Sequence, residues 1–187
     1  MVESVAMKPL RDARRTRAAI LAAAQEAFSR TGYLDTGLRE ITAAAGANPS
    51  LVSRYFGSKE RLYEAALADL LDARTITTLR PETFGESVVS ILTATVPGQR
   101  NPLPMMLLAS ADPTARAISH RLLMEVFIKP LTAWYGGERG AAKAACFSAL
   151  ASGLTVYRDL YPLEAFTGGI EAETRRWLID TFQSLID

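Results

Sequence analysis

Apolar residues recur along the chain every three or four positions, and this spacing is typical of helices with one buried face. The apolar residues of the first such stretch, which fall within one arc of about 120° on a helical wheel, are Ile20, Leu21, Ala24, Ala27 and Phe28. The pattern predicts a first helix over residues 12–31, ended where Gly32 can adopt a left-handed conformation. No sheet is expected, because no long alternation of apolar and polar residues and no Asn-Gly or Asp-Gly hairpin signal occurs.

Glycine and proline residues divide the rest of the chain into further helices. The predicted ranges are 37–45, 49–56, 59–75, 82–95, 105–110, 113–129, 138–160 and 169–186. Asn48 is expected to cap the helix that begins with Pro49, and Pro130 is expected to end or kink the helix before it. The predicted fold class is therefore all-α, with about nine helices.

The third predicted helix has two faces of different character. On a helical wheel the small polar face contains Pro49, Ser50, Ser53 and Arg54, and the bulky apolar face contains Leu51, Val52, Tyr55 and Phe56. A helix that packs on its neighbours through the apolar face presents the polar face to solvent or to a DNA major groove, which is just wide enough to admit it. With two short helices before it and a turn containing Gly46, it makes a helix-turn-helix pattern.

Charge is distributed unevenly along the chain. Residues 1–61 carry ten basic and six acidic side chains, whereas residues 62–187 carry eleven basic and fourteen acidic ones. The basic residues near the N-terminus are Lys8, Arg11, Arg14, Arg15 and Arg17. They are candidates for contacts with a phosphate backbone or a minor groove, although clustered charges are also typical of an ordinary solvated surface.

Composition excludes several kinds of chemistry. The chain has one cysteine, Cys146, and one histidine, His120, so neither an intramolecular disulfide nor a cysteine-based zinc site can form. Cys146 is expected to be a small buried residue and His120 a packing or surface residue. The sequence contains no catalytic triad order, metal-ligand cluster or phosphate-binding loop, so no enzyme, cofactor or metal is expected. Because no apolar run approaches about 20 residues, we expect a soluble, cytoplasmic protein without a membrane partner.

Three motifs in the first third of the chain occur in a characteristic order. They are Gly32-Tyr33, then Thr36 to Ile41 followed by an alanine-rich turn into Gly46, then Leu51 to Glu60 with Tyr55-Phe56 and Ser58-Lys59-Glu60. With them, residues 12–65 resemble the tetracycline-repressor (TetR) family of bacterial transcriptional regulators. The resemblance implies a helix-turn-helix domain over residues 1–57 and a ligand-binding and dimerisation domain over residues 58–187, connected by the helix at 58–75.

The resemblance also implies residues that contact DNA. Those carried over onto this sequence are Thr36, Arg39, Pro49, Ser50, Leu51, Ser53, Arg54, Tyr55 and Lys59. Arginine suits guanine, serine suits either kind of base edge, and Tyr55 and Lys59 match phosphate contacts of the family. Pairing with Asp35 is the alternative role of Arg39. Gly37 and Ser53 depart from the family pattern, which usually has a hydroxyl residue and an aromatic residue there, so the operator sequence cannot be borrowed from relatives.

Two further sets of residues are candidates for ligand binding and for dimerisation. An apolar effector could contact Met105, Met106, Met124, Phe127, Trp134, Phe147 and Tyr157. A two-fold interface implied by the resemblance would use Ala142, Ala145, Ala149, Gly153, Trp177, Leu178, Thr181, Phe182 and Leu185. For both sets the alternative is that the side chains form the protein's own core.

The function predicted from these features is that of a homodimeric regulator. It is expected to be a nucleoid-associated repressor that a small, apolar ligand releases from a pseudo-palindromic operator in double-stranded DNA. The alternative is a helical small-molecule binding protein whose DNA-binding head is vestigial.

Overall fold

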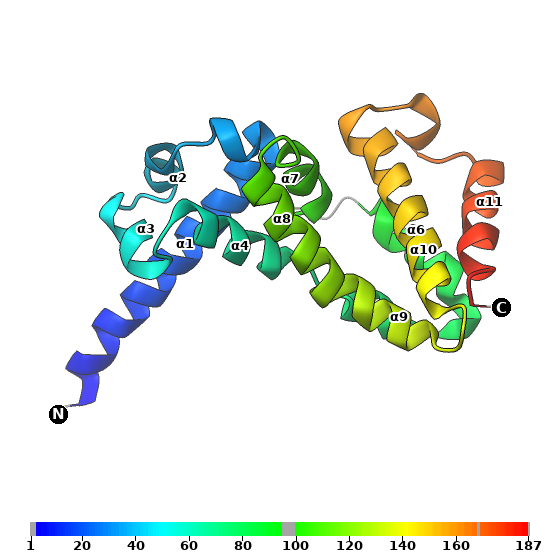
Figure 1. Cartoon of the computed structure of the whole chain (residues 1–187), viewed down its shortest axis with the longest axis horizontal. Helices are drawn as coiled ribbons and strands as arrows, with labels where there is room; N and C mark the ends of the chain where they lie inside the picture. Colours follow the sequence, from blue (N-terminus) through cyan, green and yellow to red (C-terminus); the bar gives the residue numbers. More distant parts are fainter. Residues whose placement is uncertain (1–2, 95–99, 168, 187) are drawn as a thin grey trace. The chain divides into compact units, whose positions relative to one another are not determined.

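The computed structural model describes residues 3–94, 100–167 and 169–186, with side chains from residue 12 onward (Figure 1). These residues are helical and contain no β-strand, which confirms the predicted all-α fold class. They form two compact units. The first unit contains residues 3–71 and 100–122, and the second contains residues 72–94 and 123–186.

The first unit is built around its N-terminal helix. Its helices are α1 (Glu3–Asp35), α2 (Leu38–Ala44), α3 (Ser50–Tyr55), α4 (Lys59–Leu70), α7 (Pro102–Leu108) and α8 (Pro113–Leu122). Helix α1 packs against α2, α4 and α7, and α8 packs against α4. The buried core includes Ile20, Phe28, Ile41, Val52, Leu62, Tyr63 and Met105. This core holds α2 and α3 against α1.

The second unit contains the remaining helices. They are α5 (Arg74–Thr77), α6 (Phe84–Thr93), α9 (Lys129–Tyr135), α10 (Gly140–Thr155) and α11 (Ala172–Gln183). Its core contains Phe84, Val88, Val89, Leu131, Ala144, Phe147, Leu178 and Phe182. Helix α6 lies against α11, and α10 lies against α9 (Figure 1). When the single turn α5 is left aside and α8 and α9 are counted as one helix, the described residues form the predicted nine helices.

Several helix bounds differ from the predictions. Helix α1 begins at Glu3 instead of residue 12 and, after an interruption at Gly32, continues to Asp35. Helix α7 begins at Pro102 instead of residue 105. The fourth helix was expected to reach residue 75, but α4 ends at Leu70 and the next residue, Leu71, is extended. Just after this break, the side chain of Asp72 accepts a hydrogen bond from the backbone N–H of Arg74 (2.9 Å), the first residue of the separate turn α5. Pro130 neither ends the helix before it nor separates α8 from α9. The helix widens into a π-helical turn over Leu123–Ile128 and continues to Tyr135.

The widened turn has a physical reason. A proline inside a regular α-helix lacks one hydrogen-bond donor, and its ring collides with the carbonyl four residues earlier. A π-helical turn directly before Pro130 moves these carbonyls outward, so the helix can pass the proline.

The two compact units also divide the chain differently from the predicted boundary at residues 57 and 58, because α4, α7 and α8 pack with the first three helices. The functional division at that boundary stays a prediction.

Candidate nucleic-acid interface

Helices α2 and α3 are joined by a tight turn. Helix α2 starts after Gly37, an extended residue (φ −90°, ψ 143°) that offers no side-chain cap, and the turn that follows contains Gly46 with φ 61°. At the start of α3, the side-chain oxygen of Asn48 accepts hydrogen bonds from the backbone N–H of Ser50 (3.0 Å) and from its hydroxyl (2.8 Å). Asn48 therefore caps α3 as predicted, and Ser50 is anchored at the exposed end of the helix.

The two predicted faces of α3 are confirmed. Val52 is fully buried and Phe56, the residue after α3, is 7% exposed. Leu51 and Tyr55 are half-buried at the boundary between the two faces. The polar residues of the opposite face, which are all exposed, are Pro49, Ser50, Ser53 and Arg54. The first unit thus leaves the slender polar side of a capped helix uncovered.

Arg39 lies on the solvent side of α2. It is exposed and takes part in none of the ion pairs between described residues, so the alternative pairing with Asp35 is not formed. The next residue of α2, Glu40, is engaged instead by Arg30 of α1, with 2.7 Å between the guanidinium nitrogen and the carboxylate oxygen. The charge of Arg39 therefore stays available beside α3.

Thr36 does not belong to this exposed surface. Its side chain is buried, with 1% exposed, and its hydroxyl donates to the carbonyl of Gly32 (2.5 Å) and lies 2.8 Å from the Thr31 hydroxyl. The last carbonyls of a helix lack partners within the helix, and Thr36 supplies one where α1 is interrupted at Gly32. This placement does not support the predicted DNA contact of Thr36, which stays untested.

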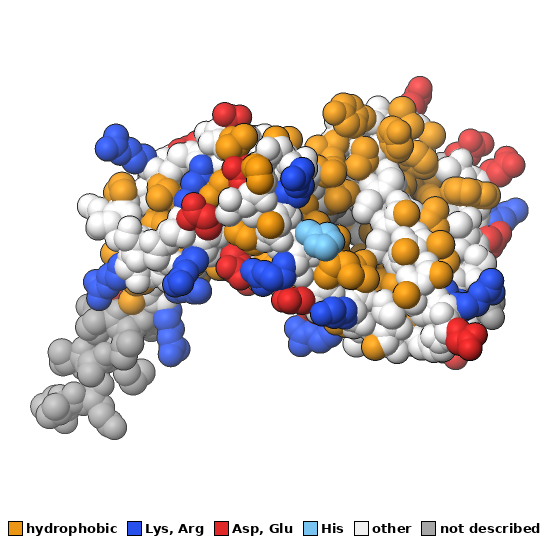
Figure 2. All heavy atoms as spheres, viewed as in Figure 1, with side chains coloured by type: hydrophobic (Ala, Val, Ile, Leu, Met, Phe, Trp, Pro, Cys, Tyr) orange, Lys and Arg blue, Asp and Glu red, His pale blue; other side chains and the backbone are white. Residues whose placement is uncertain are grey.

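Two basic side chains near α3 lie over aromatic rings. The guanidinium carbon of Arg17 is 4.8 Å from the ring centroid of Phe56, and the Nζ atom of Lys59 is 4.6 Å from that of Tyr33. Arg14 and Arg15 are also exposed on α1, whereas the side chains of Lys8 and Arg11 lie outside the described residues. Figure 2 shows Lys and Arg side chains around this part of the first unit.

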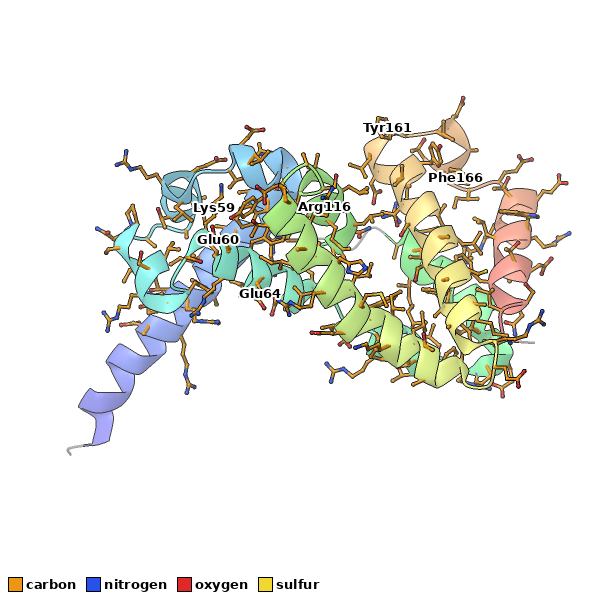
Figure 3. The ribbon with its side chains drawn as sticks, in the orientation of Figure 1. Lys59, Glu60, Glu64, Arg116, Tyr161 and Phe166 are labelled. Atoms are coloured by element: carbon orange, nitrogen blue, oxygen red, sulfur yellow. The ribbon has the colours of Figure 1, made fainter. Side chains whose placement is uncertain are left out.

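The N-terminus of α4 carries one of these basic residues, Lys59. The Ser58 hydroxyl caps the helix by accepting from the backbone N–H of Arg61 (3.2 Å). Lys59 and Glu60 follow at the start of α4 (Figure 3). Glu60 accepts a hydrogen bond from the Tyr33 hydroxyl (3.1 Å), and burial together with this carboxylate raises the pKa of Tyr33 to about 12. The phenol therefore keeps its proton, and its role as a donor, at neutral pH.

The predicted ligand residues are distributed over both compact units. Met105 and Met106 belong to the first, and Met124, Phe127, Trp134, Phe147 and Tyr157 belong to the second. Met105 and Phe147 are core residues with 0% and 1% exposed, and Phe127 and Trp134 pack against the core of the second unit. Tyr157 is 48% exposed. Core packing accounts for four of the seven, so the ligand site stays a prediction.

A surface groove in the first unit contains none of these seven residues. It is lined by Ala19, Ala22, Ala23, Glu26, Ala27, Arg30, Glu40, Ala44, Ala45 and Arg100. Ion pairs border it, since Arg30 contacts Glu40 at 2.7 Å and Arg100 contacts Glu26 at 3.6 Å. The groove is thus a floor of alanine methyl groups between α1 and α2 with charged rims.

The predicted dimer residues separate into exposed and buried sets. Ala142, Ala145 and Ala149 are exposed on α10, Gly153, Thr181 and Leu185 are half-buried, and Trp177 is 59% exposed. Leu178 and Phe182 point into the core of the second unit, with 5% and 1% exposed, so they offer no side-chain surface to another subunit. Cys146 was expected to be buried but is exposed, because the side chain that points inward on this turn of α10 is Phe147.

The exposed side of α10 is apolar. Figure 2 shows a row of hydrophobic side chains along its visible face. No charged residue occurs from Ala144 to Tyr157. None of the described helices is long and apolar enough to span a membrane.

These features define a helix-turn-helix nucleic-acid-binding head. Residues 20–66 match the family profile of bacterial regulatory proteins, tetR family, and residues 82–186 match the tetracyclin repressor-like C-terminal domain. The second match alone covers more than half of the chain. The chain therefore belongs to the tetR family of bacterial regulatory proteins, which confirms the resemblance.

Individual relatives agree with this membership. The HTH-type transcriptional regulator RutR of Escherichia coli (strain K12) is 44% identical over 54 residues, which are 29% of this chain and 26% of RutR. The match thus spans about a quarter of that relative's length.

Solved structures match over most of the chain. A TetR-family regulator from Streptomyces coelicolor A3 has a TM-score of 0.56 and 26% identity, covering 92% of this chain and 95% of its own. Native NalD, the secondary repressor of the MexAB-OprM multidrug efflux pump in Pseudomonas aeruginosa, has a TM-score of 0.65 and 20% identity, covering 90% and 95%. These similarities show that the fold extends through both halves.

Proposed function

We propose that the protein is a homodimeric repressor that binds a pseudo-palindromic operator in double-stranded DNA and is released by a small apolar ligand. The observation that carries the proposal is the exposed polar face of α3, which stands beside an unpaired Arg39 in a chain of the tetR family. A helix of this width fits the major groove, and two copies related by two-fold symmetry read two half-sites. Such a protein acts in the cytoplasm, on the chromosome.

The exposed residues of α2 and α3 suit readout of bases. Arg39 and Arg54 can each present two N–H groups to the O6 and N7 atoms of a guanine. Ser50 and Ser53 can pair with either kind of base edge, and Leu51, half-buried at the edge of the face, can meet a thymine methyl group. Because Ser53 is small, α3 can approach the base edges closely.

Phosphate contacts supply most of the affinity in this proposal. Tyr55 and Lys59 are the side chains assigned to phosphates, and the position of Lys59 at the N-terminus of α4 supports the same role. If a dimer displaces the counterions of about eight phosphates, the logarithm of the binding constant falls with the logarithm of salt concentration at a slope near −7.

The exposed side of α10 supports a dimer. A helix that is apolar on its inward and outward sides is expected to be covered on both. Its small residues, with Trp177 of α11, let a second copy of α10 approach closely. Leu178 and Phe182 are buried and hold α11 to its own unit. We therefore do not include them in the proposed interface.

Release by a ligand requires that it distinguishes two dimer shapes. To move the operator-ready population from 99:1 to 1:99, the affinities for the two shapes must differ about 10⁴-fold. The half-buried Met106 and Met124 support an apolar ligand, because methionine side chains adapt to varied shapes.

Selection of bound sequences from a random pool of duplex DNA tests the proposal. We expect a pseudo-palindromic consensus, with half-sites about one helical turn apart, and strong salt dependence for the winning duplex. Failure to enrich any sequence would overturn the operator assignment and favour a helical small-molecule binding protein with a vestigial head. That alternative is supported by Gly37, which leaves α2 without a side-chain cap.

A further inference from the structure

The contacts around Lys59 include an aromatic ring that motif comparison does not assign to DNA binding. We propose that Tyr33 is a positioning residue for DNA binding, whose ring face holds the ammonium of Lys59 at the phosphate backbone and whose hydroxyl holds Glu60 away from it. This inference rests on the proposed function, since it concerns how that surface meets phosphates. Tyr33, Lys59 and Glu60 all lie in the first unit.

The ammonium of Lys59 is held by two contacts. The Nζ atom of Lys59 lies 4.6 Å from the centroid of the Tyr33 ring and 3.5 Å from the carbonyl oxygen of Leu34, to which it donates. A lysine ammonium has three N–H donors, so one contact to Leu34 leaves donors for a phosphate. A cation within about 6 Å of a ring centroid is attracted to the ring face. Lys59 is thereby held with its charge available.

Glu60, the acidic neighbour of Lys59, is engaged by the same tyrosine. Glu60 follows Lys59 directly, and adjacent residues on a helix do not face each other. The Tyr33 hydroxyl donates to the Glu60 carboxylate (3.1 Å), and none of the ion pairs between described residues joins Lys59 to Glu60. The Ser58 hydroxyl and the backbone N–H of Glu60 act on the same carboxylate and, together with Tyr33, lower its pKa. Figure 3 shows both side chains at the start of α4. A single tyrosine thus engages the base through its face and the acid through its edge.

Tyr33 is itself held in place by other aromatic rings. Tyr33 is 7% exposed as a residue. Its ring stacks on Phe28, with centroids 5.9 Å apart, and makes an edge contact with Tyr63 at 5.3 Å. Tyr63 is fixed in turn, because its hydroxyl lies 2.7 Å from the hydroxyl of Ser119 on α8. Tyr33 is therefore a fixed platform.

A lysine side chain that is already held in place loses less conformational entropy when the complex with DNA forms. Immobilising a flexible side chain on association weakens binding by about two- to ten-fold. Tyr33 removes this cost for Lys59, so we expect that loss of the ring weakens DNA binding by about that factor for each subunit. For a dimer with two heads the effect is the square of the single-head factor.

A double-mutant cycle tests the inference in the full-length protein. Binding of a fluorescent duplex from the random-pool selection is measured over a salt series for the wild type, Tyr33→Leu, Lys59→Ala and the double variant. We expect Tyr33→Leu to weaken binding in the presence of Lys59 and to have little effect in its absence. Tyr33→Phe keeps the ring face but loses the hydroxyl that engages Glu60, so it should keep the coupling to Lys59 and should weaken binding less than Tyr33→Leu does.

Phe28→Leu is the matched control for a purely structural role. Phe28 belongs to the same ring cluster and is fully buried, but it makes no contact with Lys59 among the cation–ring contacts of the described residues. We expect Phe28→Leu to lower the melting temperature while its effect on DNA affinity is additive with that of Lys59→Ala. An equally additive effect of Tyr33→Leu would overturn the inference.

A second measurement needs no DNA. The side-chain protons of Lys59 should show ring-current shifts in the nuclear magnetic resonance spectra of the wild type and Tyr33→Phe, and should lose them in Tyr33→Leu. Unshifted protons in the wild type would overturn the placement of Lys59 on the ring. Failure of the wild type to bind any duplex overturns the proposed function and this inference together. Binding that is unaffected by Lys59→Ala overturns the inference alone.

Discussion

The close contact of α6 with α11 at Gly85 gives a stability prediction. Gly85 near the start of α6 is buried against α11, and a Cβ atom added there would lie 2.2 Å from the carbonyl oxygen of Ile179 and 3.0 Å from the backbone nitrogen of Gln183. Both neighbours are backbone atoms of a helix, so no side-chain rotation can relieve the collision. Gly85→Ala must therefore move α6 and α11 apart by about 1 Å to reach ordinary contact distances.

The size of the effect follows from three terms. Overpacking in a well-packed core costs about 1–3 kcal/mol. The separation also weakens the hydrogen bond from the Gly85 N–H to the side-chain oxygen of Gln183 (3.0 Å), a bond of a kind that contributes about 1 kcal/mol. Replacing glycine by alanine inside a helix returns about 1 kcal/mol. We expect a net loss of about 1–3 kcal/mol in the free energy of unfolding.

Urea unfolding followed by tryptophan fluorescence measures this loss. Both tryptophans, Trp134 and Trp177, belong to the second unit, so their fluorescence follows its unfolding. Glu86→Ala is the matched control, because Glu86 is the next residue of α6 and is exposed. It should change stability by no more than about 0.5 kcal/mol. A Gly85→Ala protein as stable as the wild type would refute the close packing of α6 on α11.

Three further outcomes are expected. Arg39→Ala should weaken operator binding by about 1–3 kcal/mol and relax preference at one base pair, whereas Lys59→Ala should weaken all sequences alike; equal, uniform losses in competition assays would remove Arg39 from base readout. Ala149→Arg should raise the dimer dissociation constant by at least about a hundred-fold in sedimentation experiments, while the exposed control Ala133→Arg on α9 leaves it unchanged. Because the pKa of Tyr33 is raised to about 12, the stability that this residue contributes is complete below pH 10 and is lost as pH rises towards 12. Urea unfolding of Tyr33→Phe should show a shallower decline over that range.

The helix-turn-helix could be predicted because its signals are local. The two faces of α3 follow from eight consecutive residues, and the cap at Asn48 follows from one side chain that reaches the amide two residues later. Periodicity and capping act within a few residues, so they can be read along the chain. The end of α4 was missed although a signal beside it is local too, since the side chain of Asp72 accepts a hydrogen bond from the backbone N–H of Arg74 at the start of a new turn.

Features that depend on an irregular backbone or on contacts between distant residues could not be predicted. The hydroxyl of Thr36 donates to the carbonyl of Gly32, and this contact forms where α1 is interrupted at Gly32. Tyr33 meets Lys59 across a separation of 26 positions, although the motifs containing both residues were recognised. A Gly-Tyr pair at a helix end, together with a Lys-Glu pair at a helix start, is a signal that could have suggested the contact.

Helix α10 shows why only some residues of the proposed interface could be chosen from the sequence. Its apolar residues are spread around the helix and not gathered on one side, so periodicity does not distinguish the side that packs inward from the side that remains exposed. The structure makes this distinction, with Ala144 and Phe147 inside and Ala145 and Ala149 outside. The outward side has no residue larger than a cysteine from Ala141 to Ala149 among its exposed positions. A second α10 can therefore approach at backbone contact distance, and a single long or charged side chain placed there is enough to prevent it.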